Sequence, residues 1–127
     1  MKFHLTTADN HQLITGFGVD EDTNFFVAIN NIKYKQTVIV TTNQIITEHE
    51  MTQFDALTAD NFVALLSLHP EVTLLGTGEK HRFIHPKLIA ALTAKHIPVE
   101  CMTTAAACRT FNILVSEGRN VVAVLLV

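Results

Sequence analysis

Cys108, Arg109 and Asn112 lie within little more than one helical turn of each other and offer a thiol, a cation and an amide. A cysteine acts as a nucleophile when a base and an oxyanion-binding group converge on it. The spacing of Cys108, Phe111 and Val115 instead predicts an apolar helical stripe, so we interpret Cys108 as a packed core residue. Arg109 and Asn112 fall on a more polar face. We expect Asn112 to hold a hydrogen bond. For Arg109 three alternatives stay open: contact with a ligand or partner, pairing with a carboxylate, and solvation.

The loop Gly76-Thr77-Gly78 is a second candidate, because backbone N–H groups after a strand can approach an anion. No Gly-Lys-Ser/Thr follows it, and no third glycine completes a dinucleotide-binding fingerprint. A tight turn that requires glycine is the alternative interpretation. His81 and His85 have the spacing of two metal ligands, but Pro86 follows directly and no third ligand is near. We therefore expect no metal site.

The two strands before these candidates, at 72–75 and 98–102, are expected to be parallel and joined by a right-handed crossover. Their carboxyl ends would then share the edge of the sheet at which α/β proteins bind ligands. The 76–78 loop would face the helix start at 103–105, and a helix N-terminus attracts anions. The predicted ligand-binding residues are Gly76, Thr77, Gly78, Thr103, Thr104 and Arg109, with Glu79 or His81 as acid–base partner.

The elements that position these residues follow from periodicity. The first half alternates apolar and polar residues, which is typical of half-buried strands, and Asn30-Asn31 suits a two-residue hairpin turn. In the second half, short apolar runs alternate with segments of helical periodicity, which favours a sheet covered by helices. We predict strands at 2–6, 12–19, 25–29, 32–35, 37–41, 44–48, 71–76, 97–102 and 120–127. We predict helices from the N-cap Thr58 to before Pro70, at 85–96 and at 104–118.

Length and composition predict one ordered domain over residues 1–127, since 48% of the residues are hydrophobic and 17% charged. The net charge of −3 and the scattered basic residues argue against nucleic-acid binding. The longest apolar run, at 121–127, is too short to span a bilayer. The N-terminus lacks the pattern of a secretory or mitochondrial leader, and the two cysteines form no CxxC motif. We therefore expect a cytoplasmic chain with free thiols.

An ordered signature runs through residues 72–126. It consists of Gly-Thr-Gly, then Ile-x-Val-Glu-x-Met-x-Thr, then Ala-x-x-Thr-Phe-Asn-x-Leu, then Glu-Gly-Arg. With this signature the chain resembles a small α/β family that includes mitochondrial complex I assembly factor three and the adipogenesis-associated single-domain protein. The signature residues that we interpret as a structural motif are Glu100, Met102, Thr110, Phe111 and Asn112.

The resemblance implies a three-layer α/β fold with a mixed central sheet, helices on both sides and an additional N-terminal β layer. It implies an assembly or regulatory role and no established reaction. Since no mitochondrial targeting extension is recognisable, we expect a stand-alone, bacterial-type member.

Two functions stay open at this point. The first is a non-enzymatic binding or assembly factor, with respiratory-complex biogenesis as a setting. The alternative is a small-molecule or anion-binding enzyme or sensor that uses the crevice between 76–78 and 103–105. We expect no catalytic set, no cofactor, an unidentified protein partner, no nucleic acid and no membrane insertion. The open strands of the first half also allow a homodimer.

Overall fold

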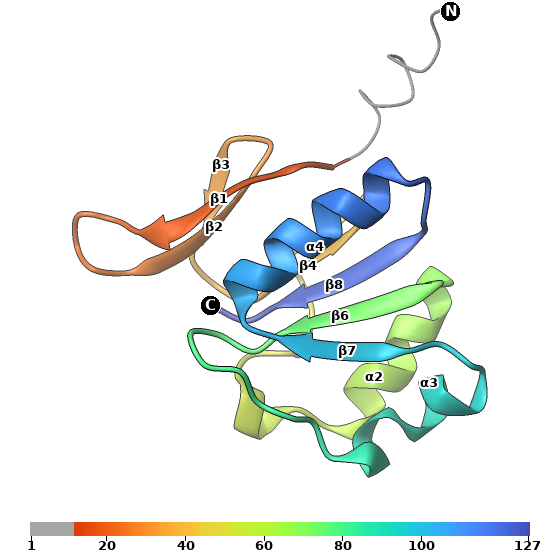
Figure 1. Ribbon diagram of the computed structural model, residues 1–127. Helices are drawn as coiled ribbons and strands as arrows, with labels where there is room; N and C mark the ends of the chain where they lie inside the picture. The colour runs from red at the N-terminus through yellow and green to blue at the C-terminus, as the bar shows by residue number, and fades with distance from the viewer. Residues whose placement is uncertain (1–11) are drawn as a thin grey trace, which may run out of the picture.

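A five-stranded and a three-stranded sheet, with helices packed around them, make up the computed structural model, which describes residues 12–127 (Figure 1). The strands are β1 (Ile14–Val19), β2 (Phe25–Ile29), β3 (Ile32–Tyr34), β4 (Val38–Thr41), β5 (Ile45–Ile46), β6 (Val72–Gly76), β7 (Val99–Met102) and β8 (Val121–Leu125). The helices are α2 (Ala59–Leu65), α3 (Ala90–Ala94) and α4 (Thr104–Ser116), with the 3₁₀ segments η1 (Phe54–Ala56), η2 (Leu66–Leu68) and η3 (Pro86–Ile89). The predicted strand 2–6 lies outside the described residues.

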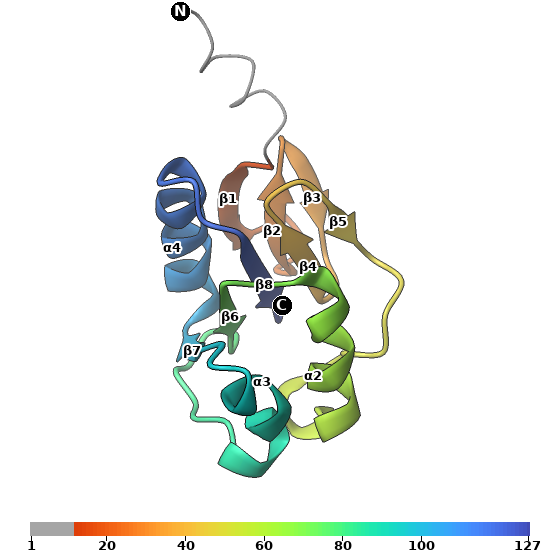
Figure 2. The ribbon, with the colours of Figure 1, turned by 90° about the vertical axis from the view of Figure 1, so that its right-hand side faces the viewer.

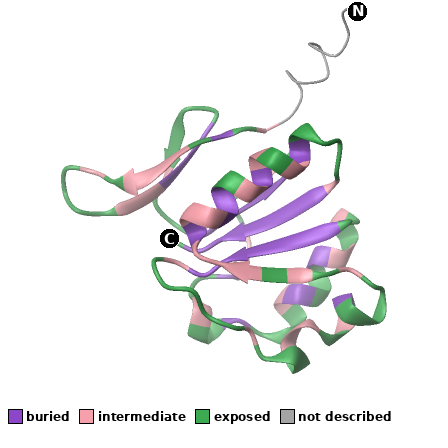
Figure 3. Ribbon diagram, in the orientation of Figure 1, coloured by how far each residue is buried: buried purple, intermediate pink, exposed green. Residues whose placement is uncertain are grey.

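The larger sheet has the strand order β5-β4-β8-β6-β7. Strand β6 runs parallel to both β7 and β8, whereas β4 is antiparallel to β8 and β5. The parallel pairing of 72–75 with 98–102 is therefore confirmed. Every residue of β6 and β8 is buried (Figure 3), as expected for apolar strands covered on both faces.

Two layers cover the two faces of this sheet (Figure 2). On one face, α4 and the small sheet β1-β2-β3 lie side by side and share a core that includes Val27, Leu74 and Phe111. On the other face, α2, η3 and α3 enclose a second core that includes Phe62 and Leu92. The predicted three-layer α/β fold is thus confirmed, and the additional N-terminal β layer shares its side of the sheet with α4.

Several local predictions have a direct structural basis. Asn30 and Asn31 have φ values of 52° and 69°, the left-handed conformation that a tight hairpin requires. The Thr58 side chain accepts a hydrogen bond from the Asn61 N–H, and the Asn61 side chain accepts from the Thr58 N–H, which is a capping box. Gly118, with φ of 82°, follows α4 and supplies the left-handed residue after the helix.

Two predicted elements were wrong in extent. The helix at 85–96 is interrupted, because Ile89 leaves helical geometry with φ of −108° and ψ of 13°, so that η3 and the short α3 replace one helix. Leu88 and Ile89 pack on the core there, and tertiary packing overrides helical propensity. The strand at 44–48 pairs only over β5, because the chain then turns away toward α2 (Figure 2).

Candidate functional site

The 76–78 loop and the start of α4 are in direct contact at the carboxyl ends of β6 and β7. A Cβ atom at Gly76 would lie 2.9 Å from the Cα atom of Thr104 and 3.2 Å from the Cβ atom of Ala107, so no side chain fits there. Gly78 has φ of +95°, which L-residues with a side chain rarely adopt. Both positions therefore require glycine for structural reasons, which agrees with the interpretation of this loop as a tight turn.

The Thr104 side chain joins this loop to the end of β8. Its hydroxyl is fully buried, donates to the Leu126 carbonyl at 2.6 Å and accepts from the Gly78 N–H at 2.8 Å. The Thr104 N–H donates to the Gly78 carbonyl at 2.9 Å. The hydroxyl thus satisfies two buried backbone groups, which is a structural task.

Thr77 has a similar role toward the next loop. Its N–H donates to the Met102 carbonyl at 2.8 Å. Its hydroxyl donates to the Lys80 carbonyl at 2.5 Å and accepts from the Arg82 N–H at 3.3 Å. Thr77 therefore holds the loop that follows β6 in one conformation.

The structure brings residues 76–78 and 103–104 together, whereas Arg109 lines a different cavity, between α4 and residues 14–17. The Thr103 hydroxyl caps α4 by accepting from the Ala106 N–H at 3.2 Å. The N–H groups of Thr77 and Gly78 are already bonded within the protein, so an anion could use them only after those hydrogen bonds open. The anion cradle stays a prediction.

Arg109, Cys108 and Asn112 lie at the seam between α4 and β1. Asn112 donates through Nδ2 to the Ile14 carbonyl at 2.7 Å and accepts through Oδ1 from the Ile14 N–H at 2.9 Å, which confirms the expected hydrogen bond. The Asn112 amide thus makes the two hydrogen bonds to the edge strand β1 that the backbone of a neighbouring strand would otherwise make. Arg109 is exposed and borders a cavity of about 250 Å³ between α4 and residues 14–17.

Cys108 is buried, as predicted. Burial raises the pKa of its thiol to about 12, and the Arg109 charge beside it lowers that pKa by a smaller amount. Because the thiolate is the nucleophile, burial and the raised pKa both disfavour reaction of this cysteine near neutral pH.

Of the other signature residues, Phe111 and Met102 have a clear structural role. Phe111 is fully buried in the core under α4, and the Met102 carbonyl accepts the Thr77 N–H. Thr110 is half-buried, and Glu100 is exposed on the edge strand β7. These residues belong to the corner between β7 and α4 and to α4 itself.

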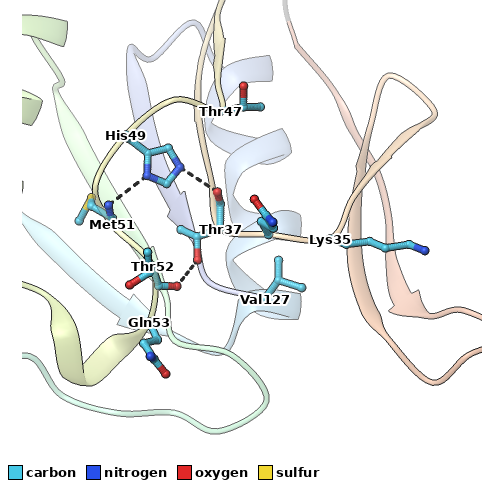
Figure 4. Close-up of a pocket in the computed structure, with 9 residues that line it drawn as sticks. Lys35, Thr37, Thr47, His49, Met51, Thr52, Gln53 and Val127 are labelled. Atoms are coloured by element: carbon cyan, nitrogen blue, oxygen red, sulfur yellow. Dashed lines mark hydrogen bonds between the residues drawn. The ribbon is translucent and has the colours of Figure 1, made fainter.

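A cavity of about 460 Å³ that sequence reasoning missed lies between the start of β4 and residues 47–53 (Figure 4). His49 fixes this segment: its Nδ1 accepts from the Met51 N–H at 3.1 Å, and its Nε2 lies 2.8 Å from the Thr37 carbonyl. Nδ1 is an acceptor, so Nε2 carries the proton, and the ring is the neutral Nε2–H tautomer. The Thr37 hydroxyl donates to the Thr52 carbonyl at 2.5 Å. The side chains of His49 and Thr37 are therefore occupied with holding this segment in place.

A second cavity, of about 310 Å³, lies between β5, residues 48–51 and α2; we call it the β5–α2 groove. Its floor is apolar and consists of Ile39, Ile46, Met51, Leu65 and Leu68. Its rim carries the exposed carboxylates Glu48, Glu50 and Asp60. Among residues 12–127, the ion pairs within 4.0 Å are Lys35–Asp20 and Arg82–Asp55, so none of these rim carboxylates has a described cation beside it.

No motif pointed to this groove, because its residues come from three separate elements. The only sequence signal was the acidic pair around His49, beside the apolar Met51.

Comparison with known proteins places this fold in a family. The model of a protein family of unknown function, DUF498/DUF598, matches residues 19–126. The chain belongs to this family. A crystal structure of a Bordetella parapertussis protein superposes with a TM-score of 0.81 at 29% identity, over 91% of this chain and 95% of that one. The likeness extends over the N-terminal strands as well as the signature region.

Two proteins that are similar to this chain have descriptive names. The "13 kDa major membrane protein" of Francisella tularensis is 28% identical over 94 residues, which cover 73% of this chain and 76% of the relative. The mouse "NADH dehydrogenase [ubiquinone] 1 alpha subcomplex assembly factor 3" is 38% identical over 65 residues, or 50% of this chain. The chain spans about a third of the length of that assembly factor, since the match covers 35% of it.

Two kinds of feature are absent from the described part of the chain. In residues 12–127 no helix combines the length and apolar character needed to cross a bilayer. Within the same range, no three His, Cys, Asp or Glu side chains gather as a metal ion would require.

Proposed function

We propose that this family member is a non-enzymatic protein-binding factor of the assembly-factor type, and that the β5–α2 groove holds its partner. The observation that carries the proposal is an apolar floor bordered by carboxylates without a described cation. Binding sites for side chains are concave and mostly apolar, with a few polar groups that orient the ligand. The groove has this composition.

The charges of the rim specify the chemistry of the partner. Glu48, Glu50 and Asp60 favour a segment in which an apolar side chain is flanked by lysine or arginine. The apolar side chain would fill the floor beside Ile46 and Leu68, and the flanking cations would reach the carboxylates. Because rim charges act mainly on association rate and specificity, the apolar insertion supplies most of the affinity.

The comparisons support a binding role, because the mouse relative is named as an assembly factor. On this basis we propose respiratory-complex biogenesis as the setting. The side chains that first suggested chemistry also support a non-enzymatic role. The Cys108 thiol is buried with a raised pKa, and the hydroxyls of Thr77 and Thr104 are bonded to the backbone.

A substitution that fills the groove tests the proposal. Ala64 is exposed on α2 and lines the groove, so Ala64→Arg places a large cation over the floor without altering the core. Val63, its neighbour on the same helix, is also exposed but does not line the groove, and Val63→Arg is the matched control. Both variants should have the thermal stability of the wild type.

Native gels of cell extracts, with the chain detected by antibody, give the readout. We expect the wild type and Val63→Arg to migrate in a complex and Ala64→Arg to migrate as the free chain. If Ala64→Arg stays in the complex, the groove is not the binding site. If the purified wild type alone forms the same species, the partner is a second copy of the chain, and the proposed assembly role fails.

A further inference from the structure

Phe83 is the most exposed of the large apolar side chains in the described residues, with 82% of its surface accessible. It lies in the segment 79–87, which follows β6 and includes the first two residues of η3; we call this segment the Phe83 loop. The only described aromatic contact of its ring is with His81, whose centroid is 4.6 Å away at a tilt of 46°. Aromatic side chains dominate core and interface energetics when they are buried, so this ring would gain free energy from contact with an apolar surface.

The loop holds Phe83 outward through internal bonds. At its start, the Thr77 hydroxyl bonds to the Lys80 carbonyl and the Arg82 N–H. After Phe83, Ile84 packs on the core under α2 and α3. His85 Nδ1 then accepts from the Lys87 N–H at 3.1 Å and starts η3. Anchors on both sides of Phe83 therefore present its ring to solvent.

Three basic residues lie within four positions of Phe83 in the sequence, although the chain as a whole has a net charge of −3. Lys80, Arg82 and Lys87 are exposed, and Glu79 is the one carboxylate within the loop. Arg82 lies 3.4 Å from Asp55 and 5.2 Å from the Phe54 ring centroid. Since both partners of that ion pair are exposed, water and salt weaken it, and Arg82 can still meet an external anion.

We propose that the Phe83 loop docks the protein on an anionic lipid surface. The Phe83 ring enters the boundary between headgroups and acyl chains, and Lys80, Arg82 and Lys87 face the lipid phosphates. An aromatic ring flanked by basic side chains is the composition of interfacial membrane contacts. This is a surface contact without a spanning segment.

The shape of the loop favours lipid over an acidic protein partner. A stable protein interface buries about 800 Å² on each side around a cluster of anchors, whereas Phe83 stands as a single projecting ring. A lipid surface needs no matching pocket and accepts one ring together with long-range attraction of a few cations. The proposal does not depend on the β5–α2 groove, because the two surfaces share no residue.

The absence of tryptophan from the sequence gives a direct test. Phe83→Trp introduces a single fluorophore at the tip of the loop. Ile113→Trp, at a 57% exposed position on α4 across the sheet, is the matched control. The probes are vesicles of pure phosphatidylcholine and vesicles of equal parts phosphatidylcholine and phosphatidylglycerol. We expect a blue shift of Phe83→Trp emission with the anionic vesicles only, and no shift for Ile113→Trp.

Flotation of the unmodified protein with the same vesicles completes the test. The wild type should float with anionic vesicles, Phe83→Ser should not, and Lys80→Gln and Lys87→Gln should each weaken binding about fivefold. Added salt should release the protein. The proposal is overturned if the wild type fails to float, if Phe83→Ser floats equally well, or if the two tryptophan variants respond alike.

Discussion

Replacing Asn112 by alanine tests how α4 is joined to the small sheet. The substitution removes two hydrogen bonds, at 2.7 and 2.9 Å, and leaves the Ile14 N–H and carbonyl without their partner. A neutral hydrogen bond contributes about 0.5–1.5 kcal/mol to stability, so two contribute about 2 kcal/mol. The adjoining cavity admits water to the freed groups, which keeps the loss below the full penalty of burying them unpaired.

Urea unfolding measures this loss. With a denaturant dependence of about 2 kcal/mol per molar urea, the midpoint of Asn112→Ala should fall by about 1 M. Ser116→Ala is the control, because within residues 12–127 that exposed hydroxyl bonds only to the Ile113 carbonyl in its own helix. Asn112→Asp should destabilise at neutral pH at least as much as alanine, since it places a carboxylate against the Ile14 carbonyl. A loss below about 0.5 kcal/mol for Asn112→Ala, equal to the control, would refute the reasoning.

Three further predictions concern single side chains. The Thr73 hydroxyl is fully buried and has no hydrogen-bond partner among residues 12–127, so Thr73→Val should raise the free energy of unfolding by about 1 kcal/mol. A decrease would mean that the hydroxyl is bonded. In thiol labelling of the folded protein at pH 8, the half-buried Cys101 should react and Cys108 should stay protected until unfolding, and equal rates would contradict its raised pKa. The Lys35 ammonium, 2.8 Å away, and backbone N–H groups lower the pKa of Asp20 to about 2. The contribution of the ionised Asp20 carboxylate to stability is therefore complete above the ordinary pKa of 3.8 and is lost as pH falls toward 2. In Lys35→Gln, an NMR titration should find the Asp20 pKa closer to 3.8; an unchanged value would assign the whole shift to the backbone.

Much of the fold was predictable because its signals are local. Thr58 and Thr103 cap their helices through contacts three residues away, and Gly118 supplies the left-handed residue after α4. The apolar runs at β6 and β8 lie in the middle of the covered sheet, where both faces are buried. Capping and periodicity are properties of short segments, so the sequence alone reveals them.

The extent of other elements depends on packing that the sequence does not display. Nothing in the composition of 85–96 indicates that Ile89 leaves helical geometry, because that break follows from contacts with the core. β5 is short for a similar reason: its length depends on where the chain turns toward α2.

The candidate site was predicted only in part. The proximity of residues 76–78 to 103–104 followed from parallel strands, and the structure has it. How closely they pack could not be predicted, since it depends on Thr104 reaching the end of β8. No motif in the sequence predicted the β5–α2 groove, because Ile39, Glu48 and Leu68 come from separate elements that only the folded chain brings together.

A photo-crosslinking residue at Ser67 is the most direct measurement of the binding role. Ser67 is exposed and lines the groove, whereas Val63 is exposed outside it and serves as the control position. We predict one crosslinked partner from Ser67 in living cells, attached through a peptide in which lysine or arginine flanks an apolar residue. Ala64→Arg should abolish this product. Crosslinks that are equal at Ser67 and Val63, or a Ser67 product that persists in Ala64→Arg, would contradict the proposal that the groove holds a protein partner.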